Sequence, residues 1–252
     1  MKQQPGYQQR ERAHFDQLAR ESGEIWWGTA TAAGWQRLRR RARMATDEFC
    51  MLDSPRVLEV GCGAGAFSRA LLALTPELRL LGCDISPASL ELARQRCSEF
   101  VRAEFVEADA LDLPFEAGSF DVVVGNSILH HLPARSTLQQ CLEVLRPGGV
   151  LWLSEPNMLN PQIAVEKNVR FIGRLLQNTA DETAFFRWSI ARVLRRLGFD
   201  DVSVAPFDFL HPLVPAPLVE VAERVGRICE RLPVVREIAG SLVIRASAPA
   251  VR

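Results

Sequence analysis

The chain has 252 residues, which is enough for one large α/β domain with a full hydrophobic core. Its 30 basic and 30 acidic side chains cancel, so no overall field favours nucleic acid or an acidic membrane as a partner. The six cysteines form no Cys-x-x-Cys pair, the polar start has no apolar leader, and no apolar stretch reaches about 20 residues. These features predict a soluble, cytoplasmic protein with reduced thiols and no membrane span.

Residues 1–52 are predicted to form a polar, helical segment in front of the main domain, which we place at 53–252. Trp26 and Trp27 stand out in this segment, with Trp35 close behind them. They either pack against the domain or form a lid that contacts the substrate. On the second interpretation, we predict that Trp26 and Trp27 bind the substrate.

Five arginines follow within the seven residues from Arg37 to Arg43. They suit a solvated helix face. They also suit a clamp for an anionic group of the substrate, because the planar guanidinium matches carboxylate and phosphate.

From residue 56 onward, strand and helix patterns alternate, as in a parallel sheet covered by helices on both faces. We therefore predict a doubly wound, mostly parallel, seven-stranded, Rossmann-like sheet. The predicted strands are 57–60, 79–83, 104–106, 120–124, 150–154, 199–205 and 241–246. Helices are predicted to begin near 67 and 87 and to span 136–145 and 187–197, with a break at 146–149.

Two segments interrupt this alternation and are predicted to be inserts, at 156–186 and 206–236. Four prolines between Pro206 and Pro217 predict an irregular connection. An amphipathic helix then follows, which packs either on its own domain or on a partner, so the oligomeric state stays open. Its predicted apolar face consists of Leu218, Ala222, Val225, Cys229 and Leu232.

The first predicted strand runs into three glycines at alternate positions, Gly61, Gly63 and Gly65. Glycine permits a sharp turn and lets a ligand approach the backbone without a Cβ in the way. A turn of this kind presents backbone amides and a helix N-terminus to a ligand. Because Gly61-x-Gly63-x-x-Ala66 also satisfies the loose dinucleotide pattern, the turn alone does not distinguish the cofactor.

Polar side chains end the next three predicted strands, at the edge where open α/β sheets bind ligands. Asp84 is placed to accept hydrogen bonds from two ribose hydroxyls. Asp109 can accept from an adenine amino group while Ala110 offers a backbone N–H, and Asn126 ends the fourth strand. Glu59 is an acid inside a strand, so we expect it to accept hydrogen bonds from the glycine loop or from the ammonium group of a ligand.

As an ordered set, the motifs between about 55 and 155 resemble the class I S-adenosylmethionine-dependent methyltransferases, particularly the type 11 group. The resembling stretches are Val57–Gly65, Gly82–Ser86, Ala108–Phe115, Ser119–Val123 with Leu129–Leu132, and Leu145–Gly149. The resemblance implies S-adenosylmethionine as cofactor, with Gly61, Cys62 and Gly63 along its methionine part, Asp84 and Ile85 at the ribose and adenine, Asp109 and Ala110 at the adenine edge, and Asn126 under the methionine.

The implied activity is methyl transfer to a hydroxyl, amine or carboxyl of a small molecule, for example a natural-product or sugar-like acceptor. His131, or His130 beside it, is the candidate general base because histidine titrates near neutral pH; the alternative is that both shape the pocket floor. We place His211 at the substrate rim and His14 at the surface. No residue pattern indicates a metal site.

Two other functions stay open. The first is an NAD(P)-dependent oxidoreductase, which the glycine pattern and Asp84 permit. Against it, Tyr7 is the single tyrosine, so no Tyr-x-x-x-Lys pair exists to move a proton. The second is a catalytically inactive cofactor-binding protein on the same fold.

Overall fold

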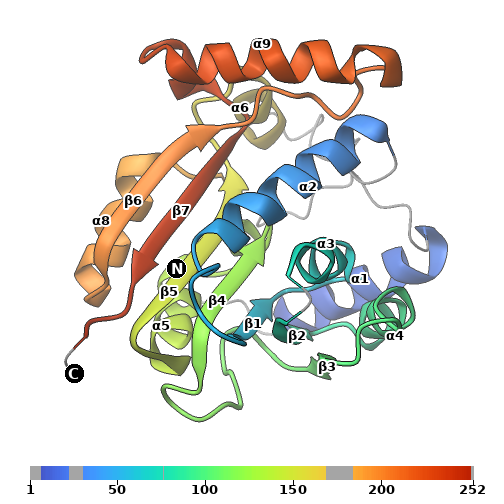
Figure 1. The fold of residues 1–252 in the computed structure, drawn as a ribbon, viewed down its shortest axis with the longest axis vertical. Coiled ribbons are helices and arrows are strands. Elements are labelled where there is room, and N and C mark those ends of the chain that lie inside the picture. The colour runs from blue at the N-terminus through green and yellow to red at the C-terminus, as the bar shows by residue number, and fades with distance from the viewer. Residues whose placement is uncertain (1–6, 23–30, 76, 169–183, 251–252) are drawn as a thin grey trace.

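A computed structural model describes residues 7–22, 31–75, 77–168 and 184–250 (Figure 1). Seven strands form one sheet in the order β3-β2-β1-β4-β5-β7-β6, and β7 alone runs antiparallel to its two neighbours. The predicted doubly wound, mostly parallel sheet is confirmed. The strands are β1 (Arg56–Val60), β2 (Arg79–Asp84), β3 (Ala103–Glu107), β4 (Phe120–Asn126), β5 (Leu145–Pro156), β6 (Asp200–Phe207) and β7 (Ser241–Ser247).

Helices cover both faces of the sheet, as Figure 1 shows. The α-helices are α1 (Tyr7–Ser22), α2 (Ala32–Asp47), α3 (Ala66–Leu74), α4 (Pro87–Arg96), α5 (Ala134–Val144), α6 (Pro161–Asn168), α8 (Arg187–Leu197) and α9 (Val219–Arg231). Short 3-10 turns lie at Leu129–His131, Ala216–Leu218 and Val235–Ile238.

Two apolar cores sandwich the sheet, because successive side chains of a strand point to opposite faces. In β4, Val123 joins the core under α5 and α8, whereas Val122 and Val124 join the core under α2, α3 and α4. All three valines are fully buried. The expectation that this strand is buried on both faces is confirmed.

Helix α5 ends at Val144, so the predicted helix break before 146–149 is confirmed, but strand β5 begins at Leu145 rather than at Val150. The pairing partners jump from Phe120–Leu145 to Val122–Val150, so residues 146–149 form a bulge in β5. Gly148 N donates to the carbonyl of Ala248, and Ala248 N donates to that of Gly149. These bonds hold the segment against the chain that follows β7.

The 206–236 segment also differs from the prediction. Pro206 and Phe207 belong to β6 instead of starting an irregular connection. Helix α9 exists, but only part of the predicted apolar face packs on the domain. Ala222 packs against the small buried cluster of Ala33, Leu210 and Val219, whereas Leu218, Val225 and Leu232 are 48% to 54% exposed. Periodicity defines the faces of a helix without fixing which of them is buried.

The arginine run of α2 joins this helix to the 206–236 segment. Arg37 and Arg41 donate to Asp208, and Arg40 makes two hydrogen bonds to Glu230, of 2.7 and 2.5 Å. Three of the five arginines are thus paired with carboxylates of the protein itself. A purely solvated face is therefore wrong for this run.

The cysteines are all free thiols. Four of them, Cys62, Cys83, Cys97 and Cys141, are buried, as their apolar surroundings predict, whereas Cys50 is exposed and Cys229 is partly exposed. Among the described residues, no helix has the length and apolar character needed to cross a membrane.

Candidate active site

The glycine turn connects β1 to α3 and uses the left-handed backbone region, with φ of 67° at Gly61, 51° at Gly63 and 77° at Gly65. A Cβ on Gly61 would lie 2.4 Å from the Ile128 side chain, whereas a Cβ on Gly63 would meet nothing within 4 Å. Gly63 therefore leaves open space beside its backbone, as a turn that receives a ligand requires.

Gly65 is the third glycine of the predicted ligand-binding turn. It does not line the cavity that the other two glycines face, and a Cβ at this position would lie 2.8 Å from the Cα of Ala93 in α4. Its missing side chain lets α3 and α4 approach each other closely.

Asp84, at the end of β2, organises the glycine turn. Its carboxylate accepts hydrogen bonds of 2.9 Å from the backbone N–H groups of Gly63 and Ser86. Burial raises the pKa of Asp84, although these amides oppose the change. The carboxylate also lines the cavity, where each oxygen keeps acceptor capacity for a ligand hydroxyl.

Glu59 is 1% exposed and lies in β1 at the base of the same cavity. Its carboxyl accepts a 2.6 Å hydrogen bond from Ser68 of α3, rather than from the glycine loop as expected. Burial raises the pKa of Glu59 to about 8. The acid is therefore mostly protonated at neutral pH unless a cation is close to it.

The end of β3 supplies a third wall. Asp109 accepts a 2.9 Å hydrogen bond from the backbone N–H of Leu111, and Ala110 lies between them on the cavity surface. Ile85, after β2, lines the same half of the cavity. The carboxyl ends of β1, β2 and β3 thus place these predicted residues side by side.

Asn126, at the end of β4, contacts Arg41, which belongs to the arginine run of α2. Its Oδ1 accepts from Arg41 Nη1 at 3.3 Å, and Arg41 also donates to Asp208 and Ser241. Burial lowers the pKa of Arg41 to about 10, so its guanidinium stays charged at neutral pH. The buried Arg41 Nε has no hydrogen-bond partner among the described residues.

Glu155, near the end of β5, is the main site residue that the sequence analysis missed. It is 1% exposed and accepts hydrogen bonds from the backbone N–H groups of Ile128, Leu129 and His130. Its Oε2 also lies 2.8 Å from His130 Nδ1. The same strand-end rule that selected Asp84, Asp109 and Asn126 would have found it.

His131 follows in the same turn, and its ring centroid is 4.0 Å from that of His130. Phe15 of α1 packs edge-on against it. Burial is the main cause that lowers the pKa of His131 well below its usual value, so this imidazole is neutral at physiological pH. His14, expected at the surface, instead lines the cavity.

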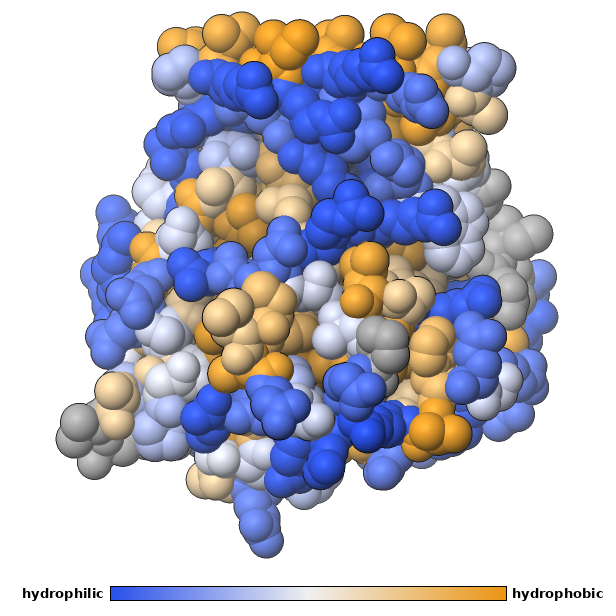
Figure 2. All heavy atoms as spheres, viewed as in Figure 1, coloured by the Kyte–Doolittle hydropathy of each residue, from blue (hydrophilic) through white to orange (hydrophobic). Residues whose placement is uncertain are grey.

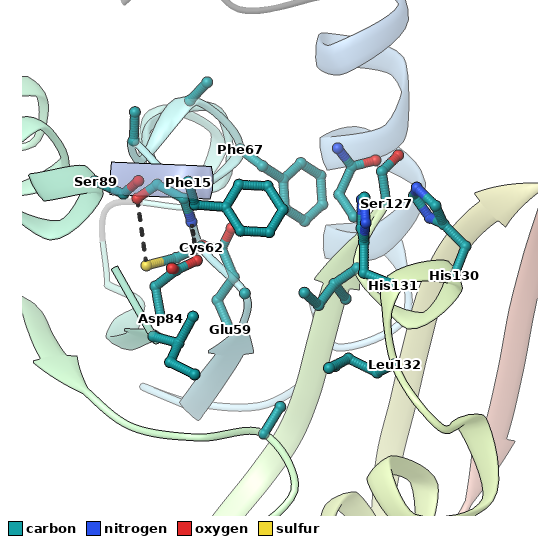
Figure 3. A pocket seen from close by; sticks show the side chains of 18 of the residues that line it. Phe15, Glu59, Cys62, Phe67, Asp84, Ser89, Ser127, His130, His131 and Leu132 are labelled. Atoms are coloured by element: carbon teal, nitrogen blue, oxygen red, sulfur yellow. Dashed lines mark hydrogen bonds between the residues drawn. The ribbon is translucent and has the colours of Figure 1, made fainter. Parts of the chain in front are cut away.

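These residues surround one cavity of about 430 Å³, a size within the range of small-molecule sites. Figure 3 shows Glu59, Cys62 and Asp84 on one side and His130 and His131 on the other, with Phe15 between them. Helix α1 covers the cavity, and Ile163 and Lys167 of α6 add to its wall.

The predicted substrate-binding residues are not among the described lining of the cavity. Trp26 and Trp27 lie outside the described residues. His211 is absent from the described lining of the cavity; its Nε2 is 3.1 Å from Gln162 Nε2 of α6. In the described part of the chain, no three His, Cys, Asp or Glu side chains form a group able to hold a metal ion.

Comparison with known proteins finds similarity to methyltransferases. Residues 57–149 match the sequence model of a methyltransferase domain. The chain is 33% identical to erythromycin 3''-O-methyltransferase of Saccharopolyspora erythraea over 165 residues, 60% of this chain and 53% of that protein. It is 31% identical to 2-methyl-6-phytyl-1,4-hydroquinone methyltransferase of Synechocystis over 174 residues, 68% of this chain and 54% of that protein. The chain spans about half the length of these two curated relatives.

Solved structures of methyltransferases have a similar fold. The N-methyltransferase NodS of Bradyrhizobium japonicum, in complex with S-adenosyl-l-homocysteine, matches with a TM-score of 0.62 and 18% identity, over 94% of this chain and 98% of NodS. At this identity the likeness concerns the fold alone.

Proposed function

We propose that this chain, whose residues 57–149 are a methyltransferase domain of the class I S-adenosylmethionine-dependent family, methylates a hydroxyl group of a small molecule. The observation that carries the proposal is the buried His130–Glu155 pair, which shares one cavity with the glycine turn. A hydroxyl, unlike a carboxylate, must lose a proton to become methylated, and this pair can accept one.

The cofactor half of the cavity suits S-adenosylmethionine. Gly61 and Gly63 would hold its methionine part, Asp84 its ribose, and Asp109 with Ala110 its adenine. Within the described ranges, buried Glu59 has no cation among its hydrogen-bond partners, so it suits the ammonium group. The donor Nε of Arg41, which has no partner in the described structure, suits an anionic ligand group. Bound S-adenosylmethionine supplies an activated sulfonium methyl group, which leaves positioning and proton removal to the protein.

The hydrogen bond to Glu155 indicates which ring nitrogen of His130 carries a proton. A carboxylate only accepts hydrogen bonds, so the proton between the two groups belongs to His130 Nδ1, and Nε2 is the accepting nitrogen. Nε2 would accept the proton that the acceptor hydroxyl loses on methylation, and the methyl–sulfur bond of the donor would break to leave S-adenosylhomocysteine. Glu155 then stabilises the imidazolium, as the carboxylate does in other His–carboxylate pairs. His131, with its lowered pKa, shapes the wall beside it.

The test starts from a panel of sugar, phenol and macrolide hydroxyl compounds, with release of S-adenosylhomocysteine as the readout. With the acceptor found, His130→Asn keeps a donor for Glu155 but removes the base. We expect turnover to fall about 10²- to 10⁴-fold, while calorimetry gives S-adenosylmethionine affinity within about twofold of the wild type. Glu155→Gln should lower turnover by about 10- to 100-fold.

His131→Asn is the matched control and should affect turnover less than His130→Asn does. Equal losses of turnover and cofactor affinity in His130→Asn would contradict a base and favour a wall residue. Cofactor binding without turnover of any panel member would favour the inactive binding protein. Tighter binding of NAD than of S-adenosylmethionine would favour the oxidoreductase.

A further inference from the structure

Helix α9 packs on the protein with its apolar side facing the solvent. Val221, Val225 and Ile228 are 53% to 59% exposed, and Leu218 and Leu232 extend the same row at each end. The spacing of three and four residues places all five on one face. Figure 2 shows this row as a hydrophobic band along the upper edge of the molecule, where Figure 1 shows α9.

Polar contacts fix this orientation. On the inner face, Glu223 accepts a 2.6 Å hydrogen bond from Gln36, and Glu230 accepts two from Arg40, all on α2. Gly226 lies against Phe209, so close that a Cβ there would be 3.2 Å from the Phe209 Cβ. Turning the helix to bury its apolar side would break these contacts.

The apolar surface continues beyond the helix. Leu213, Val234 and Ile238 are 75%, 84% and 44% exposed. Of the fifteen large hydrophobic residues that are exposed in the described structure, eight lie between Leu213 and Ile238. Single exposed apolar residues are ordinary, whereas such a concentration marks an interaction site.

The charges beside the row are mainly positive. Arg224 and Arg231 are exposed on α9 and make no ion pair within the described part of the chain. Arg227 is also exposed and pairs with Glu223. Glu223 and Glu230 are both engaged on the inner side, which leaves Glu220 as the exposed acid of the helix.

We propose that α9, together with Leu213, Val234 and Ile238, docks this protein on the surface of an anionic lipid bilayer. An apolar face flanked by arginines is the arrangement of helices that lie in the membrane interface. The apolar row enters the boundary with the acyl chains, and Arg224 and Arg231 contact anionic headgroups. The zero net charge of the whole chain does not oppose this, because the attraction is local.

A second copy fits this surface less well. In a symmetric pair of α9 helices, Arg224 and Arg231 would face arginines of the other copy, and like charges repel. A helix of 13 residues is only about 20 Å long. A contact between the two α9 helices alone buries less than the roughly 1,200 Å² of a stable interface.

The test is sedimentation of the whole chain with vesicles of phosphatidylglycerol and phosphatidylcholine, or of phosphatidylcholine alone. We expect binding to the anionic vesicles, at least tenfold weaker binding to the neutral ones, and weaker binding at high salt. The double variant Val225→Asp/Ile228→Asp and the double variant Arg224→Glu/Arg231→Glu should each lower binding at least tenfold. Val101→Asp, at a residue 96% exposed between α4 and β3, is the matched control and should bind as the wild type does.

Unchanged binding by Val225→Asp/Ile228→Asp, or no binding of the wild type to anionic vesicles, would overturn the proposal. So would a wild-type dimer in analytical ultracentrifugation that this variant converts to a monomer, because a second copy would then cover the face. Affinity for S-adenosylmethionine should be the same in all variants, so the result is independent of the proposed methyl transfer.

Discussion

At the residue scale, Glu59 shows how burial sets the charge of a side chain. It is enclosed in β1 with Ser68 as its hydrogen-bond donor, and its pKa is raised to about 8 from an ordinary 4.5. Between these two values the folded protein holds a proton that the unfolded chain has released. The free energy of unfolding therefore decreases as the pH rises through this window.

This leads to a prediction for the protein without cofactor. Glu59→Gln removes the titration, so its unfolding free energy should fall less steeply than that of the wild type between pH 5 and pH 8. One proton corresponds to a slope difference of at most about 1.4 kcal/mol per pH unit. Urea unfolding at several pH values measures it. Glu104→Gln, at an exposed position of β3, is the control and should follow the wild type; equal slopes for all three proteins would refute a raised pKa.

At the element scale, the turn between β1 and α3 combines two glycines with separate roles. Gly63 borders open space in the cavity, whereas Gly65 allows α3 to pack against α4. Both have positive φ, so an alanine at either position carries a similar backbone cost of about 1–2 kcal/mol. Only their surroundings differ.

We expect Gly65→Ala to lower the unfolding free energy by about 1–3 kcal/mol more than Gly63→Ala does, because its Cβ would press on the backbone of Ala93. Gly63→Ala should instead weaken S-adenosylmethionine binding while the protein stays folded. Thermal unfolding and calorimetry of the two variants measure these effects. The reverse pattern would mean that the ligand lies elsewhere.

At the scale of the whole molecule, ion pairs join α2, near the N-terminus, to the 206–236 segment, near the C-terminus. Asp208 is 3% exposed, and Arg37 and Arg41 both donate to it. Burial alone would raise the pKa of Asp208, but the two guanidinium groups outweigh burial and lower it. Arg41 also reaches Asn126, so the same carboxylate supports the cavity wall.

Removal of this carboxylate should therefore affect both stability and the site. We expect Asp208→Asn to lower the unfolding free energy by about 3–5 kcal/mol, because it leaves buried guanidinium groups without their counter-charge. Hydrogen exchange should increase at the end of β6 and in α2. Asp201→Asn, at an exposed position of β6, is the control; a loss of the same size there would show that the effect is not due to the paired arginines.

The parts of this fold that the sequence predicted depend on local patterns. The strands with their polar ends at Asp84, Asp109 and Asn126 follow from alternation and from the glycine turn. The parts that it missed depend on distant pairs. His130 meets Glu155 across 25 positions, and Arg41 meets Asp208 across 167. The periodicity of apolar residues does not encode such pairings. It also does not show that α9 contacts α2 through its charged face.

The buried thiols have a practical consequence for spectroscopy. Burial raises the pKa of Cys97 and Cys141 to about 12 and those of Cys62 and Cys83 far above the ordinary value. Alkylating reagents attack the thiolate form, so these four sulfurs are shielded from maleimide chemistry near neutral pH. Cys50 and Cys229 remain accessible to varying degrees. A fluorophore on Cys229, with Cys50 replaced by serine, would report the polarity around α9 without any engineered attachment point.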